Sequence, residues 1–154
     1  MAAFDASRTG APAALAADHT GLEVLSRGEC LRLLGRARVG RVVVSTNALP
    51  AAFPVHFALL DGHPVFRTVA GSKLDAALNE TVVAFEVDEL DVAGCHGWSV
   101  LIQGRASVLG PSPDAARAEA LLVPWRFDAA PHLVRVRSEL VSGRRLPPVR
   151  LPIW

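Results

Sequence analysis

Four residues that could bind an anionic group lie close together in the stretch VFRTVAGSKLDAALNE. Arg67 and Thr68 end a predicted strand, and Ser72 and Lys73 open a predicted helix. The glycine between the two elements lets the chain turn there. Backbone N–H groups at a helix start carry a partial positive charge, so they could bind a phosphate together with these side chains.

Lys73 is the only lysine in a chain that contains fifteen arginines. An ammonium group is a compact charge on a flexible stem, and it suits a single oxygen in a tight place. A simpler interpretation is that Ser72 caps the helix together with Asp75, while Arg67 and Lys73 point into water. The residues alone leave both interpretations open.

The stretch FPVHF, residues 53–57, is also irregular. Pro54 interrupts a good strand pattern, which indicates an edge or a bulge whose backbone groups could face a flat polar ligand. His56 is the polar member of an apolar run, a position more typical of a partly buried structural histidine. The histidines show no metal-ligand spacing, so no metal site is predicted. No catalytic residue is named, since the Cys95-His96 pair is interpreted as a chance pairing in a loop.

Length and composition limit the classes of protein that fit. A chain of 154 residues with a net charge of +1 suits one ordinary domain and has no basic patch for nucleic acid. No run approaches the roughly 18 apolar residues that a membrane span needs. Two distant cysteines and no secretory signal favour a cytoplasmic location. We expect a loose tail over 1–21, one domain over 22–146 and a C-terminal tail over 147–154.

The pattern of apolar residues predicts a mainly β, α+β domain. Helices are expected to begin at Ser26, Ser72 and Ser112, each a capping residue. A hairpin is expected to turn at Asp61-Gly62. The six predicted strands are 39–46, 51–60, 65–68, 81–88, 97–109 and 132–141. So many alternating strands in a small domain favour a six-stranded antiparallel barrel with short flanking helices.

The segments FPVHF, DG, VFRTVAGSKLDAAL, VAFEVD, GWSVLIQGRA and SGRRL, in this order, carry a family resemblance. From about residue 25 to 146 the chain resembles the small flavin-binding split-barrel proteins related to pyridoxamine 5'-phosphate oxidase. The compact bacterial group that includes nitroimidazole-resistance proteins is the most similar. The resemblance implies a split-barrel homodimer with FMN in the groove between the subunits.

The resemblance also implies roles for individual residues. Arg67 and Lys73 match the phosphate ligands, and Thr68 and Ser72 lie beside them as hydroxyl donors. His56 stands where the family usually has asparagine, which alters the hydrogen bonding near a flavin. The implied ring-facing segment is Phe53, Pro54, Val55 and His56, and the segment that approaches the flavin, from the other subunit, is Trp98 and Ser99.

By this resemblance the protein is an FMN-binding oxidoreductase of unknown substrate, with a small molecule and NAD(P)H as visiting partners. The sequence lacks the long C-terminal portion that binds the vitamin in true pyridoxamine phosphate oxidases, so that specific activity is not expected. The rich use of alanine, arginine and valine suits a high-GC genome. The resemblance implies that relatives in such bacteria can bind a deazaflavin coenzyme instead of FMN, so this coenzyme is an alternative. The other alternative is a non-enzymatic dimeric scaffold that holds flavin or haem, or has no cofactor.

Overall fold

Most strands form where apolar and polar residues alternate, and two helices begin directly after serines that the sequence indicates. The computed structural model describes residues 17–72, 74–75, 78, 80–124 and 126–148. Its helices and strands are β1 (Glu23–Val24), α1 (Arg27–Leu34), β2 (Val39–Thr46), β3 (Leu49–Leu60), β4 (His63–Val69), β5 (Val82–Asp91), β6 (His96–Val108), α3 (Pro113–Leu121), β7 (Pro131–Val136) and β8 (Leu140–Leu146).

The helix caps confirm two of the predicted helix starts. The Oγ atom of Ser26 accepts a hydrogen bond from the N–H of Glu29 at 3.2 Å, and that of Ser112 accepts from Ala115 at 3.1 Å. The predicted helix after Ser72 falls partly on residues 73, 76–77 and 79, which lie outside the described residues. No helix in the described part of the chain is long and apolar enough to cross a membrane.

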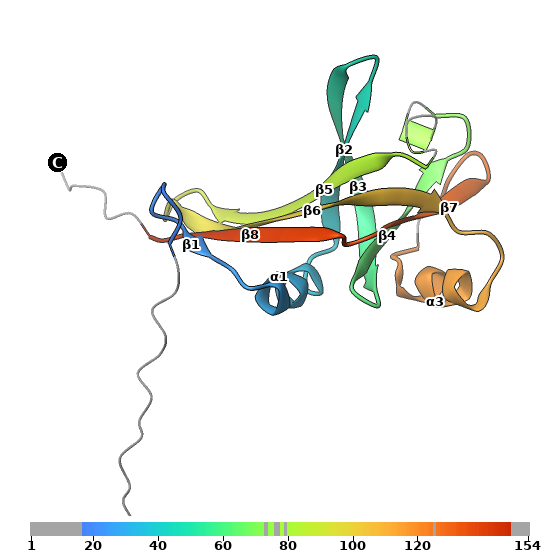
Figure 1. Ribbon diagram of the computed structural model, residues 1–154. Coiled ribbons are helices and arrows are strands. Elements are labelled where there is room, and N and C mark those ends of the chain that lie inside the picture. The colour runs from blue at the N-terminus through green and yellow to red at the C-terminus, as the bar shows by residue number, and fades with distance from the viewer. Residues whose placement is uncertain (1–16, 73, 76–77, 79, 125, 149–154) are drawn as a thin grey trace, which may run out of the picture.

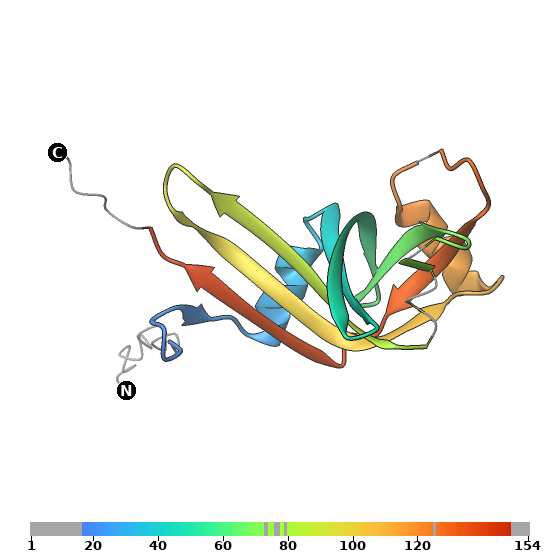
Figure 2. The same ribbon diagram turned by 90° about the horizontal axis from the view of Figure 1, so that it is seen from above.

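All strand pairs are antiparallel, and six strands close into a barrel. Around the barrel the order is β6, β5, β2, β3, β4 and β7, and β7 pairs with β6 again to complete the ring. Strands β8 and β1 extend the sheet beyond β6. Figure 2 shows β5, β6 and β8 running side by side away from the barrel, while α3 lies beside β7 at the other end. The barrel prediction therefore holds, but the total is eight strands rather than six.

The expected single strand over 132–141 was wrong, because the chain forms two strands, β7 and β8, with a break at residues 137–139. At the break the N–H of Arg137 donates to the carbonyl of Arg105 on β6 at 3.0 Å. A Cβ atom on Gly104 would lie 1.8 Å from the carbonyl oxygen of Arg137, so the crossing requires glycine. Strand β6 thereby pairs with β8 before this point and with β7 after it.

The core has two parts. The main core fills the barrel and the space under α1, and the rings of Phe57 and Phe85 meet in it edge to face with centroids 4.9 Å apart. Each fully buried phenylalanine contributes roughly 1.5–3 kcal/mol. The second core lies between α3 and the β3–β4 hairpin and contains Leu60, Ala118 and Leu122. Figure 1 shows α1 and α3 below the sheet, α1 beside β8 and α3 near β4 and β7. The second core therefore fixes where α3 lies relative to the hairpin.

Candidate functional site

The β3–β4 hairpin positions the predicted site residues on two faces. Its turn confirms the prediction, because Asp61 and Gly62 both have positive φ, 51° and 81°. Phe57 lies opposite Phe66, and both are buried. His56 precedes Phe57 and Arg67 follows Phe66, so both lie on the opposite face from this buried pair. We call this opposite face of β2, β3 and β4 the outer face.

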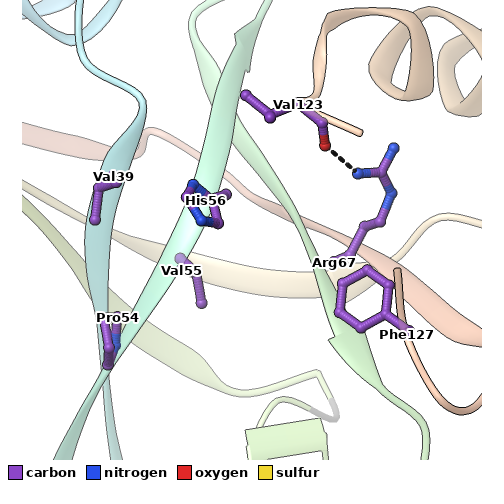
Figure 3. Close-up of a pocket in the computed structure, with 7 residues that line it drawn as sticks. All are labelled: Val39, Pro54, Val55, His56, Arg67, Val123 and Phe127. Atoms are coloured by element: carbon purple, nitrogen blue, oxygen red, sulfur yellow. Dashed lines mark hydrogen bonds between the residues drawn. The ribbon is translucent and has the colours of Figure 1, made fainter. Parts of the chain in front are cut away.

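A cavity of about 330 Å³ opens on the outer face, and Figure 3 shows its lining. Its walls come from β2, β3, β4 and the segment that follows α3. Four of the predicted site residues take part, and three further residues were missed by the sequence analysis. The lining residues are Val39, Pro54, Val55, His56, Arg67, Val123 and Phe127. Most of this lining is apolar, and Arg67 is the single arginine or lysine among these residues.

The side chain of Arg67 is largely sheltered, with 14% of it exposed. Its Nε donates to Oε2 of Glu119 in α3 at 2.9 Å, and its Nη2 donates to the same oxygen. Its Nη1 donates to the carbonyl oxygen of Val123 at 3.0 Å, the contact drawn in Figure 3. Over the described residues these bonds occupy three of the five N–H groups of the guanidinium. Arg67 therefore ties the end of α3 to β4.

The hydroxyl groups predicted beside the phosphate bond to each other. Thr68 is buried, and its Oγ1 lies 3.2 Å from Oγ of Ser72. Oγ of Ser72 also accepts from the N–H of Asp75 at 3.1 Å, which is the hydrogen bond that the capping interpretation predicts. The part of that interpretation that placed Arg67 in water is wrong, because Arg67 is paired with Glu119. Lys73, the residue that prompted the phosphate hypothesis, lies outside the described residues. Its role stays a prediction.

Asp75 adds a negative charge close to this turn. Its Oδ2 accepts from the N–H of Gly71 at 2.8 Å, and its Oδ1 lies 2.7 Å from Nδ1 of His132 on β7. The hydrogen bond from Gly71, followed by that from His132, holds the pKa of the Asp75 carboxyl below its usual range, against the opposing effect of burial. Both carboxylate oxygens of Asp75 therefore make contacts that hold the turn in place.

The remaining predicted site residues lie away from the cavity. Phe53 packs against the main core. Trp98 is 7% exposed, belongs to the main core and lines a separate hollow with Glu89, His96 and other residues. The hydroxyl of Ser99 donates to Glu86 at 3.4 Å. Within one chain the structure thus brings together Pro54, Val55, His56 and Arg67 in the lining of the cavity. Phe53, Trp98 and Ser99 are not part of that lining.

Sequence reasoning could find Arg67 but not its partner. Glu119 lies 52 residues away in a helix whose polar residues resemble an ordinary solvent face. The segment after α3 is rich in apolar residues, and this was the one sequence feature that pointed to Val123 and Phe127. Strand and helix patterns do not predict where such a segment lies in the fold. Among the described residues, no group of three His, Cys, Asp or Glu side chains could hold a metal ion. The described lining offers apolar walls and one cation, Arg67, which suits a flat ligand with an anionic group.

Comparisons with known proteins agree with the fold. The profile of the family described as pyridoxamine 5'-phosphate oxidase matches residues 26–145. The uncharacterized protein Rv0080 of Mycobacterium tuberculosis is 37% identical over 127 residues, which are 79% of this chain and 84% of that protein. An FAD-binding protein from Mycobacterium smegmatis is 35% identical, with a TM-score of 0.72 over 80% of this chain and 99% of that one.

A second solved structure, an FAD-binding protein from Mesorhizobium loti, is 25% identical with a TM-score of 0.68. The alignment covers 82% of this chain and 99% of that one. The profile match alone spans well over half of the chain, and the identities to the two mycobacterial proteins exceed 30% over most of it. The chain therefore belongs to the pyridoxamine 5'-phosphate oxidase family.

Proposed function

We propose that the protein binds a flavin nucleotide in the outer-face cavity, with Arg67 directed at the phosphate next to the ribityl chain. One observation carries the proposal: the cavity joins an apolar wall to a single guanidinium, at the β4 position that the resemblance gives to a phosphate ligand. Two similar solved proteins are described as FAD-binding, and they support a flavin rather than another cofactor.

The residues present fit such a ligand. A volume of about 330 Å³ lies at the lower end of the range of about 300–1,000 Å³ typical of small-molecule sites. Val39, Pro54, Val55 and Phe127 supply apolar surface for a flat ring, and a guanidinium is suited to two phosphate oxygens at once. His56 lines the same cavity and places an imidazole where the resemblance predicts an amide. The fit supports binding and orientation by this chain's own residues.

FMN and FAD share the phosphate that Arg67 would hold. FMN is the expectation from the resemblance, whereas the two similar solved proteins are described as FAD-binding. The second phosphate and the adenosine of FAD would extend beyond the first phosphate, so Arg67 does not choose between the two nucleotides. We propose a flavin nucleotide as the class and leave the choice to the titration below.

We further propose that the functional unit is a homodimer. In one chain the Trp98–Ser99 segment does not line the cavity. The resemblance implies that this segment reaches the flavin from the other subunit. Exposed Val39, with 52% of its surface accessible, lies at the cavity wall where such a partner could cover it. A covered cavity would exclude water from the ring.

As an enzyme the protein would be an oxidoreductase, since a bound flavin supplies hydride chemistry while the protein supplies position and electrostatics. Arg67 would fix the phosphate end, the apolar wall would orient the ring, and His56 would offer a hydrogen-bonding group beside it. NAD(P)H and a small-molecule substrate would approach from the open side of the cavity. No residue is assigned a catalytic role.

The test is a titration of the purified protein, stripped of any cofactor, with FMN, FAD, a deazaflavin coenzyme and haem. Absorbance and fluorescence report binding, and added NADPH or NADH then reports whether the bound cofactor cycles. Saturable binding of FMN or FAD is the expected result. Binding of deazaflavin or haem alone would replace the proposed cofactor, and binding of none of the four would favour a scaffold without a cofactor.

A further inference from the structure

We propose that Glu119 is an internal anion that competes with the flavin phosphate for Arg67 and thereby lowers the affinity of the site for phosphorylated ligands. The inference rests on the proposed function and concerns how that site is regulated. It starts from an observation that phosphate binding alone does not explain: the one guanidinium of the cavity is already paired with a carboxylate.

The Glu119 carboxylate binds Arg67 in the way that a phosphate would. Two N–H groups of Arg67, on Nε and Nη2, donate to a single oxygen of Glu119, and a third N–H donates to the carbonyl of Val123. A phosphate oxygen would be bound by the same edge of the guanidinium. Phosphate and Glu119 therefore cannot both occupy this edge, and a negative charge left beside it would repel the phosphate.

The two partners differ in how freely they can move. The side chain of Arg67 is 14% exposed, while that of Glu119 is 47% exposed. A half-exposed glutamate can rotate into water at a small cost, because it exchanges a protein contact for solvation. Arg67 is the fixed member of the pair and Glu119 the replaceable one, so an incoming phosphate would displace Glu119.

Helix α3 does not need this ion pair to stay in place. Arg117, two residues earlier, donates to both oxygens of Asp61 at 2.7 and 2.9 Å and ties the helix to the β3–β4 turn. Ala118 and Leu122 are buried against the hairpin as well. Neutralising Glu119 should therefore change the charge around Arg67 without removing α3 from the hairpin.

The opposite role for Glu119 makes a contrary prediction. If its carboxylate served to orient Arg67 for phosphate binding, loss of the charge would weaken binding. Competition requires that loss of the charge strengthen it. The sign of the change in affinity therefore separates the two roles, and a ligand without phosphate shows whether the effect involves the phosphate.

The experiment measures FMN and riboflavin dissociation constants for wild type, Glu119→Gln and Asp61→Asn. Asp61→Asn is the matched control, because it breaks the other ion pair between α3 and the hairpin, away from the cavity. We expect Glu119→Gln to bind FMN about two- to fivefold more tightly, the size expected for a partly exposed ion pair. Riboflavin affinity should stay unchanged in all three proteins, and FMN affinity should stay unchanged in Asp61→Asn.

Unchanged or weaker FMN binding by a folded Glu119→Gln protein overturns the inference while leaving flavin binding intact. An equal gain for riboflavin also overturns it, since the effect would not involve the phosphate. In an Arg67→Ala background Glu119→Gln should have a smaller effect on FMN affinity, because competition for the guanidinium is then absent, and a double-mutant cycle tests this directly. If the wild type binds neither FMN nor FAD, the proposed function fails first and the inference fails with it. Thermal unfolding of each variant without flavin checks that it is folded.

Discussion

Arg67 differs from the exposed arginines of this protein in its surroundings. Its side chain is 14% exposed, against 53% for Arg117, which pairs with Asp61 at the surface. Charges sheltered from water are screened less by salt, so their interactions are stronger than those of surface pairs. A ligand phosphate would therefore bind more strongly to Arg67 than to Arg117.

Replacing Arg67 with alanine should weaken FMN binding by about one to two powers of ten, the effect of losing a charged hydrogen bond of about 1.5–3 kcal/mol. Arg67→Lys keeps the charge and loses the planar fork, so it should restore only part of the affinity. Arg117→Ala is the control and should leave the affinity unchanged. Fluorescence titration measures all four proteins, and equal FMN affinity in wild type and Arg67→Ala would refute the phosphate assignment.

His63 provides a pH-dependent contribution to stability away from the cavity. Burial, reinforced by the charges of Arg135, Arg27 and Arg137, lowers the pKa of its imidazole, and Asp61 opposes this only weakly. Its Nδ1 accepts from the N–H of Ser138 at 3.0 Å, a contact that requires an unprotonated nitrogen. The folded state therefore favours neutral His63.

Because the folded pKa of His63 lies below the unfolded one, its contribution is present above the ordinary value of 6.5 and is lost as the pH falls below it. The free energy of unfolding should fall between about pH 7 and pH 5, before the carboxyl groups titrate. In His63→Asn, whose side-chain oxygen can still accept from Ser138, the fall should be smaller. Urea unfolding across this range measures both proteins, and identical pH profiles would show that His63 contributes nothing.

At the level of elements, local pattern was enough to find most strands and helices. Alternation located β2 to β6, and the Asp61-Gly62 turn and the caps Ser26 and Ser112 were found from residue type alone. Strands β7 and β8 were joined into one, because their alternation continues across 137–139 with no glycine or proline to mark the break. The break is imposed by β6 crossing at Gly104, a contact between distant segments that local pattern does not contain.

The crossing at Gly104 makes a stability prediction. An alanine there would bring its Cβ to 1.8 Å from the carbonyl oxygen of Arg137, and two backbone segments would have to separate. Gly104→Ala should lower the free energy of unfolding by about 1–3 kcal/mol, as in other overpacked sites. Gly110→Ala, where no atom lies within 4 Å of the new Cβ, should change it by less than about 0.5 kcal/mol. Equal stability of the two variants would contradict the close crossing.

The sequence predicted the part of the candidate site that lies within one hairpin, but not the contacts between elements. Pro54, Val55, His56 and Arg67 lie on one hairpin, so a strand pattern brings them together. The ion pair between Arg67 and Glu119 joins β4 to α3, and the wall at Val123 and Phe127 depends on where the second core places that helix. Those contacts arise from packing between elements, which no periodicity in one segment reveals.

For the whole molecule, the proposal requires two chains. Light scattering coupled to size exclusion should give twice the chain mass of 16.3 kDa. Flavin affinity should decrease at protein concentrations low enough for the chains to separate, because the partner's Trp98–Ser99 segment would then be lost. A mass of one chain with flavin still bound tightly would rule out the shared site.

The most direct test of the central claim compares FMN with riboflavin on the same cofactor-free wild-type protein. The two ligands share the ring and the ribityl chain and differ in the phosphate that Arg67 is proposed to hold. We predict that FMN binds more tightly by about one to two powers of ten, since that phosphate gains a charged hydrogen bond. Equal dissociation constants, or binding of neither ligand, would contradict a phosphate-anchored flavin site.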